Sequence, residues 1–217
     1  MTTLASHMPD PAEAFAPDAD VVTLADGGRI LVRPLLPSDR EELAQRYLEL
    51  SPEARRLRFF NAPDHLSSRL LDYLIDVEGP DRCALVAQAV DDDGGPGVGL
   101  ARYVRSRDDP SLAEAAVTVL DAYQSRGIAT ALLRRLADDA LAHGISTFTA
   151  SVMWENRQLL DGLRAFGAEV VPGEPGVAEV RIALPEPDTA LRESQLHRVL
   201  RAFAARVDDV IGLRFQR

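Results

Sequence analysis

The segment from Ala113 to Thr130 places the strongest constraint on how this chain folds. Apolar and small residues alternate as in a β-strand up to Leu120, and a tight turn through Gly127 then leads at once into a helical pattern. The first turn of a helix leaves backbone N–H groups without intrahelical partners, at the positive end of the helix dipole. The segment therefore indicates a possible binding site for a phosphate group.

The composition of this turn separates it from the two commonest phosphate-binding loops. No Gly-Lys-Ser/Thr follows, as a P-loop would require, and the Gly-x-Gly-x-x-Gly pattern of dinucleotide-binding folds is missing. Gly127 and Ala129 are small enough for a pyrophosphate to approach the backbone, and Arg126 adds a positive charge. On these physical grounds alone, a plain strand–helix turn is as good an interpretation as a phosphate site.

Periodicity predicts the other elements of the domain. Strands are expected at 21–24, 29–33, 83–90, 98–105, 113–120, 147–152, 168–171 and 177–184. Helices are expected from 38, with a Ser38–Glu41 capping box, from 52, and over 67–77, 127–143 and 156–166. This order of strands and helices indicates a mixed α/β or α+β domain rather than a strictly alternating parallel one.

The two ends of the chain differ from this domain. Residues 1–20 are rich in Pro, Ala and Asp without periodicity, which indicates a disordered tail. Two prolines, Pro185 and Pro187, mark a boundary before an amphipathic helical pattern. We therefore divide the chain into a tail at 1–20, a domain at 21–185 and a helical extension at 186–217. The extension is expected to pack on the domain, and a homodimer surface is the alternative.

The charge balance and the single cysteine limit the partners and the compartment. The 217 residues include 24 Lys and Arg against 34 Asp and Glu, a net charge of −10, which argues against nucleic acid binding. Such a protein is better suited to attracting cationic groups such as lysine side chains. Cys83 lies in an apolar run, which indicates a buried, inert thiol in a reducing compartment. Without a membrane-spanning stretch or a signal peptide pattern, we expect a cytoplasmic protein with no membrane partner.

The histidines give no indication of a metal site. His65, His143 and His197 do not have the spacing of metal ligands, and no cysteine cluster accompanies them. Cys83 also has no evident base in the sequence nearby, so a nucleophilic triad is poorly supported. We expect no metal.

The turn resembles a motif of the GNAT superfamily of N-acetyltransferases. Gln124-x-x-Gly127-x-Ala129 is similar to the Gln/Arg-x-x-Gly-x-Gly/Ala motif that binds the coenzyme A pyrophosphate. Later positions of that fold match at Gly144, Ile145, Asn156 and Gly167. The resemblance covers roughly 30–184 and implies a central mixed, mostly antiparallel sheet with helices on both faces. It also implies acetyl-coenzyme A as co-substrate, bound where the motif strand and the next strand diverge, and direct transfer of the acetyl group to an amine.

Several segments resemble the catalytic domain of bacterial protein lysine acetyltransferases of the Pat type. They are 51–53, 57–60, 84–87 and 113–119. Some Pat members carry a cyclic-nucleotide-binding domain in front of the catalytic one, and the short stretch before the helices leads us to expect none here. The implied acceptor is a protein lysine. A small-molecule amine acetyltransferase and a non-catalytic acyl-coenzyme A sensor are the alternatives.

The resemblance also implies roles for individual residues. Glu114 corresponds to the general base of the similar enzymes, with solvation of the strand edge as the alternative. Cofactor contacts are implied for Val117, Thr118, Val119, Gln124, Ser125, Arg126, Gly127, Ile128, Ala129, Thr130 and Asn156.

Some implied roles stay open. Leu163 stands where many members have a tyrosine as general acid, and Tyr123 and Ser151 are candidate substitutes. Asn156 is also suited to capping a helix. Whether Arg55 to Phe60 bind substrate or pack a helix is likewise undecided.

Overall fold

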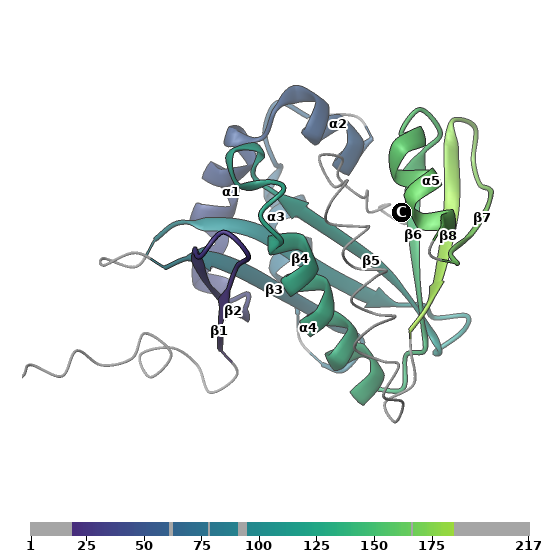
Figure 1. Cartoon of the computed structure of the whole chain (residues 1–217), viewed down its shortest axis with the longest axis horizontal. Coiled ribbons are helices and arrows are strands. Elements are labelled where there is room, and N and C mark those ends of the chain that lie inside the picture. Colours follow the sequence, from purple (N-terminus) through teal and green to yellow (C-terminus); the bar gives the residue numbers. More distant parts are fainter. Residues whose placement is uncertain (1–18, 61–62, 78, 91–94, 166, 185–217) are drawn as a thin grey trace, which may run out of the picture.

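The computed structural model of the chain describes residues 19–60, 63–77, 79–90, 95–165 and 167–184. Within them, eight strands form one sheet in the order β1-β2-β3-β4-β5-β6-β8-β7 (Figure 1). The strands are β1 (Asp20–Thr23), β2 (Arg29–Pro34), β3 (Arg82–Ala89), β4 (Gly97–Arg105), β5 (Leu112–Val119), β6 (Thr147–Met153), β7 (Glu169–Pro172) and β8 (Val177–Ala183). Neighbouring strands in the described sheet are antiparallel apart from β5 and β6, which are parallel. The expected mixed, mostly antiparallel sheet is confirmed.

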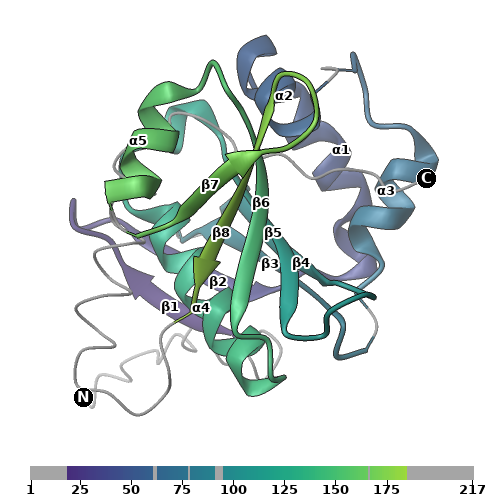
Figure 2. The same cartoon turned by 90° about the vertical axis from the view of Figure 1, so that its right-hand side faces the viewer.

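Helices cover both faces of the sheet. They are α1 (Arg40–Glu49), α2 (Pro52–Phe59), α3 (Ser68–Ile75), α4 (Ile128–Ala142) and α5 (Arg157–Ala165), with 3-10 turns η2 (Pro37–Asp39) and η3 (Asp121–Tyr123). Figure 2 shows α1, α2 and α3 on one side of the sheet and α4 and α5 on the other. Each face therefore has its own hydrophobic core.

The alternation of side chains along β5 supplies both cores. Ala115 and Val117 are buried in the cluster that includes α4 and α5, whereas Ala116 and Leu120 are buried in the cluster under α1, α2 and α3. Successive side chains of a strand point to opposite faces, so an almost continuous run of small apolar residues suits a strand covered on both sides.

Close packing of α4 on the sheet depends on a glycine in β4. A Cβ on Gly99 would lie 3.0 Å from Cδ1 of Leu132 and 3.2 Å from Cγ2 of Ile128. A Cβ at this position would require these two side chains to move by a few tenths of an ångström. The glycine therefore lets α4 pack closely on β4.

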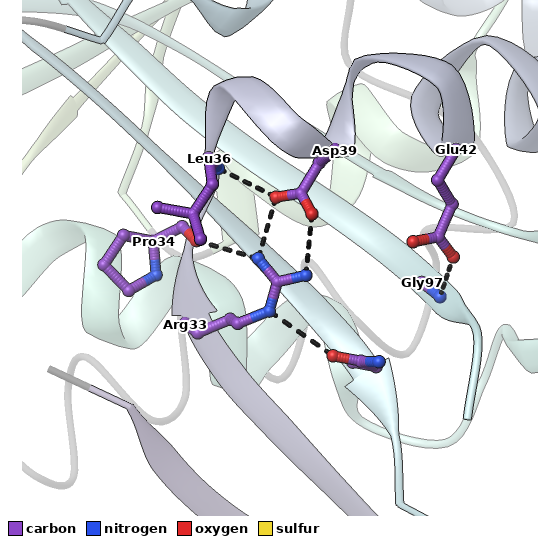
Figure 3. A network of polar contacts seen from close by, with 7 residues as sticks. Arg33, Pro34, Leu36, Asp39, Glu42 and Gly97 are labelled. Atoms are coloured by element: carbon purple, nitrogen blue, oxygen red, sulfur yellow. Dashed lines mark hydrogen bonds and ion pairs between the residues drawn. The ribbon is translucent and has the colours of Figure 1, made fainter. Parts of the chain in front are cut away.

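The start of α1 is fixed by a buried ion pair rather than by the predicted capping box. Arg33 on β2 donates from both terminal nitrogens to Asp39, at 2.8 and 2.9 Å, and Asp39 also accepts from the Leu36 N–H at 2.8 Å (Figure 3). The helix begins at Arg40 with no side-chain cap, so the expected Ser38–Glu41 capping box was wrong. A long-range partner on β2 decides the entry of the chain into α1.

Three sequence expectations lie partly or wholly outside the described residues. These are the disordered tail at 1–20, the helical extension at 186–217 and the dimer surface on it. Among the residues that are described, no helix has the length and apolar character to span a bilayer. In the same part of the chain, no group of three or more His, Cys, Asp or Glu side chains is arranged to hold a metal ion.

Candidate active site

Strands β5 and β6 are joined over only a short stretch and then separate. Their register covers Leu112 to Glu114 against Thr147 to Thr149. Beyond it the two strands diverge, as Figure 1 shows. The remaining half of β5 therefore has a neighbouring strand on the β4 side and a gap on the β6 side.

The backbone of β5 presents alternate residues to this gap. The Leu120 N–H donates to the Val98 carbonyl at 2.9 Å, and β4 and β5 are antiparallel. Because paired residues alternate in such a ladder, Thr118 bonds toward β4, whereas Val117 and Val119 direct their N–H and C=O groups toward the gap. The Val119 carbonyl accepts a hydrogen bond from Gln124 Nε2 at 3.3 Å.

Helix α2 bridges the open end of the gap. Arg58 Nε donates to Thr118 Oγ1 on β5 at 3.0 Å. Arg56 forms an ion pair with Glu155, which follows β6, and its Nη1 lies 3.3 Å from Met153 Sδ. One helix thus contacts both diverging strands and holds their ends apart.

The turn before α4 is strained and leaves the helix uncapped by any side chain. Ser125 has φ 59° and Gly127, the N-cap of α4, has φ 93°. The first intrahelical bond runs from the Ala131 N–H to the Gly127 carbonyl, so the N–H groups of Ile128 and Ala129 have no intrahelical acceptor. Positive φ at a non-glycine residue is uncommon and recurs at binding sites. This helix end has the chemistry of an anion site.

Arg126 in the same turn is held by the β1–β2 hairpin. Its Nε donates to Asp26 Oδ2 at 2.6 Å, and its guanidinium lies 5.6 Å from the centre of the Tyr123 ring. The hydrogen bond from Arg126 lowers the pKa of Asp26. The positive charge of Arg126 therefore lies beside the turn, and the Asp26 carboxylate is paired with it.

Asn156 combines a helix cap with an unsatisfied donor. Its Oδ1 accepts from the Leu159 N–H at 3.2 Å, which caps α5. The side chain is 6% exposed, and Nδ2 is buried without a hydrogen-bond partner. A buried amide N–H₂ without an acceptor costs free energy, which a bound ligand would recover.

Glu114 is the last residue of β5 that pairs with β6, and it lies on the face covered by α1, α2 and α3. Its charge raises the pKa of both Arg58 and Arg102, although burial lowers the pKa of each more strongly. For Arg58, burial and the Arg102 charge together bring the pKa to about 9, so the guanidinium is still charged at pH 7. The predicted base therefore lies in the field of two buried cations.

The other sequence candidates have mostly structural partners. Asp121 accepts from the Ser51 N–H at 3.0 Å, as expected for a turn residue. Leu163 is 1% exposed in the core beneath α5, so no side chain there donates to a leaving group. Tyr123 and Ser151 are half-buried.

The environment of Cys83 is that of an unreactive thiol. Burial, together with the Asp139 carboxylate, raises the pKa of Cys83 to about 12. Its side chain is half-buried rather than fully buried. Since the thiolate is the nucleophile, Cys83 is not suited to covalent catalysis.

Two residues of the site were missed by the sequence reasoning. Arg102 is 0% exposed in the middle of β4, and Asp26 holds Arg126 from another strand pair. A signal for Arg102 was present, because an arginine in the otherwise apolar run Leu100-Ala101-Arg102-Tyr103 is unusual in a buried strand. No local signal marks Asp26, whose partner lies 100 residues away.

Similarity to known proteins agrees with this geometry. Residues 42–167 match the Acetyltransferase (GNAT) family. The chain belongs to the GNAT family. Members of this family are acetyltransferases that use acetyl-coenzyme A as co-substrate, so this GNAT protein is an N-acetyltransferase.

Individual relatives agree with this assignment. The GNAT protein is 35% identical to Acetyltransferase PA5475 of Pseudomonas aeruginosa over 147 residues, 68% of this chain and 78% of that protein. It is 32% identical to Acetyltransferase Pat of Mycolicibacterium smegmatis over 177 residues, 81% of this chain and 52% of Pat. The chain thus corresponds to about half the length of Pat.

Solved structures show the same fold. The crystal structure of the GNAT domain of S. lividans PAT superimposes with a TM-score of 0.68 at 30% identity, over 76% of this chain and 97% of that domain. A cAMP-binding acyltransferase from Mycobacterium smegmatis gives a TM-score of 0.53 at 26% identity, over 88% of this chain and 56% of that chain.

Proposed function

We propose that this GNAT protein transfers the acetyl group of acetyl-coenzyme A to lysine side chains of proteins, with Glu114 as general base. The observation that carries the proposal is the separation of β5 from β6 beyond Glu114, together with the N-terminus of α4, which no side chain caps. The similarity to Pat supports a protein lysine as the acceptor. On the sequence grounds given above, we place the activity in the domain at 21–185 and in the cytoplasm.

The residues around the gap fit acetyl-coenzyme A. The N–H groups of Ile128 and Ala129 suit the pyrophosphate, because they have no intrahelical acceptor and lie at the positive end of α4. Val117 and Val119 offer backbone groups to an extended pantetheine arm, as a strand offers them to a neighbour. The buried Nδ2 of Asn156 supplies a further donor.

The chemistry requires one proton acceptor. The amine nitrogen attacks the thioester carbonyl, the N–C bond forms and the C–S bond breaks, so that acetyl-lysine and the coenzyme A thiolate result. Free lysine has a pKa of about 10.4 and must lose a proton to attack, so the reaction needs a base, and the family resemblance implies Glu114 for this role. A thiol pKa of about 8.5 makes the thiolate an adequate leaving group without an acid at Leu163.

Replacement of the base tests this proposal. Glu114→Gln keeps the size and polarity of the side chain, so acetyl-coenzyme A should bind as in the wild type while kcat/KM falls by about 100-fold or more. The matched control is Glu41→Gln, because Glu41 is exposed on α1. Binding is measured by calorimetry, and transfer by thiol release together with mass spectrometry of acetyl-lysine in a mixed protein acceptor.

Three results would contradict parts of the proposal. Unchanged turnover in Glu114→Gln would remove Glu114 as the base. Turnover with small amines but none with protein lysines would favour a small-molecule acetyltransferase. Tight binding of acetyl-coenzyme A without turnover on either class would favour an acyl-coenzyme A sensor, the role to which the apolar Leu163 also points.

A further inference from the structure

A cavity lies on the α1 side of the sheet, next to the diverging part of β5. Its volume is about 70 Å³. Most of its wall is apolar and includes Leu43, Tyr47, Leu50, Leu100 and Leu120. The cavity therefore has room for a short carbon chain.

Most charged side chains at this cavity are paired with protein groups. Asp39 is paired with Arg33, and Glu42 accepts from the Gly97 N–H at 2.8 Å, as Figure 3 shows. Glu42 also forms an ion pair with Arg46. Arg58 differs from these residues. It lines the cavity, it is 2% exposed, and its Nη1 is buried with no hydrogen-bond partner.

Arg102 repeats this pattern beside Arg58. It is 0% exposed, and its Nε, Nη1 and Nη2 all lack a hydrogen-bond partner. Its guanidinium lies 4.4 Å from the centre of the Tyr73 ring. This cation–π contact stabilises the charge from one face, but it provides no acceptor for the N–H groups. Its neighbour Arg82 is paired with Asp76 and offers no negative charge to it.

The charges of this group do not balance within the described side chains. Arg58 and Arg102 carry two positive charges, and Glu114 is the carboxylate whose charge acts on both. Two buried cations thus share this carboxylate, and four of their nitrogen atoms are buried without a hydrogen-bond acceptor among the described residues. Burying an uncompensated cation costs several kcal/mol, so a missing anion is the simplest account of the arrangement.

We propose that Arg58, backed by Arg102, binds a carboxylate of one of the two substrates. This inference rests on the proposed acetyltransferase site, because the cavity and the predicted base lie on the same face of β5. A carboxylate is the expected anion because a guanidinium matches it with two parallel hydrogen bonds. The apolar walls fit the carbon chain that carries it. The carboxylate comes from one of two sources. One is a dicarboxylic acyl group that replaces acetyl on coenzyme A. The other is a small amine acceptor that is also an acid, in which case the small-molecule alternative replaces the protein lysine while the acetyltransferase chemistry stays the same.

The first arm of the test examines the acyl group. Acetyl-, butyryl- and succinyl-coenzyme A are titrated by calorimetry, since butyryl and succinyl have the same chain length and differ by the terminal carboxylate. If the acyl group is the source, succinyl-coenzyme A binds the wild type at least 10-fold more tightly than butyryl-coenzyme A. Arg58→Met removes that preference.

The second arm examines the acceptor. With acetyl-coenzyme A as donor, thiol release is compared for leucine and methionine and for their α-amides, which lack the carboxylate. If the acceptor is the source, the free amino acids have at least 10-fold higher kcat/KM than the amides in the wild type. Arg58→Met lowers this ratio toward one, whereas the control Arg69→Met, at an exposed position of α3, leaves it unchanged.

The outcomes separate this inference from the proposed function. A carboxylate preference in either arm confirms the site and names its source. Tight binding of acetyl-coenzyme A with no preference in both arms would overturn the inference and leave the acetyltransferase site intact. No binding of acetyl-coenzyme A would overturn both.

The melting temperature separates an arginine that binds a ligand from one that only stabilises the core. We expect Arg58→Met to melt at or above the wild-type temperature, because a buried unpaired charge is replaced by an apolar group of similar length. A large loss of stability together with an unchanged carboxylate preference would assign Arg58 to the core instead.

Discussion

At the scale of single residues, the buried polar side chains fall into two groups. Among the described residues, Arg33, Arg58, Arg102 and Asn156 are buried. Arg33 is fully engaged by Asp39, the Pro34 carbonyl and Gln88. The other three each retain a donor without an acceptor. Arg58 lines the cavity, the charge of Arg102 acts on Arg58, and Asn156 lies between β6 and α5. An unsatisfied donor is thus present at each of the two places where a ligand is proposed to bind.

Breaking the satisfied pair tests the first group. Burial alone would raise the pKa of Asp39, but hydrogen bonds from Arg33 and the Leu36 N–H lower it overall. Asp39→Asn leaves a buried Arg33 without its anion, so we expect a loss of about 3 kcal/mol in unfolding free energy, measured by urea denaturation. The control Asp72→Asn removes an exposed pair with Arg40 and should cost less than about 1 kcal/mol.

The same pair predicts a dependence on pH. A carboxyl group whose pKa is lower in the folded state stabilises the fold at pH values above its unfolded pKa of about 3.9, and this stabilisation is lost as the pH falls through the lowered folded value. The difference between wild type and Asp39→Asn should therefore shrink in acid. A difference that is constant from pH 7 to pH 3 would contradict the role of the ion pair.

Asn156 allows its two functions to be separated. Asn156→Asp keeps an oxygen that accepts from the Leu159 N–H and caps α5, but it removes the Nδ2 donor. We expect binding of acetyl-coenzyme A weakened at least 10-fold, because the variant loses one hydrogen-bond donor and adds a negative charge beside an anionic ligand. Asn156→Ala should lose about 1 kcal/mol of stability as well. If Asn156→Asp binds like the wild type, Nδ2 does not contact the ligand.

At the scale of elements, local patterns predicted most strands and helices to within a few residues. The Asp26-Gly27-Gly28 turn joins β1 and β2 as expected, and Ser51 and Ser67 cap α2 and α3 through their hydroxyl groups. These signals are local, since a turn or a cap involves residues two to four positions apart. The start of α1 was predicted less well because its partner, Arg33, belongs to another element.

The partners of the basic segment from Arg55 to Phe60 also belong to other elements and could not be predicted from local sequence. Arg55 donates to the Leu48 and Leu50 carbonyls of α1, and Arg56 pairs with Glu155. Only Arg58 reaches the buried face of β5. The sequence indicated an unusual helix but could not distribute its three arginines among these roles, because their partners lie on separate elements. The length of the β5–β6 pairing was equally inaccessible, since strand pairing is a contact between segments far apart in the sequence.

At the scale of the whole molecule, the residues proposed for the two substrates lie on opposite faces of the sheet. The α4 and α5 side holds the uncapped helix end and Asn156, which suit acetyl-coenzyme A. The opposite side holds Glu114, Arg58 and the cavity. Beyond Glu114, β5 has no hydrogen-bonded neighbour on the β6 side, and we propose that the two substrates meet there. With this arrangement we expect direct transfer through a ternary complex, as the family resemblance implies, without a covalent intermediate on the enzyme.

The central claim is that the N-terminus of α4 binds the pyrophosphate of acetyl-coenzyme A, and two glycines of the same helix provide a matched test. Gly127 and Gly144 lie at opposite ends of α4 with φ of 93° and 78°, and no atom lies within 4 Å of a Cβ added to either. Glutamate at either position therefore costs a similar strain of about 1–2 kcal/mol. It places a negative charge at the phosphate site only at Gly127.

The decisive measurement is a calorimetric titration of acetyl-coenzyme A into the wild type, Gly127→Glu and Gly144→Glu, with melting temperatures recorded for all three. We predict tight binding by the wild type and by Gly144→Glu, and affinity reduced at least 100-fold in Gly127→Glu, with similar losses of thermal stability in both variants. Absence of binding by the wild type, or equal weakening in the two variants, would contradict the account.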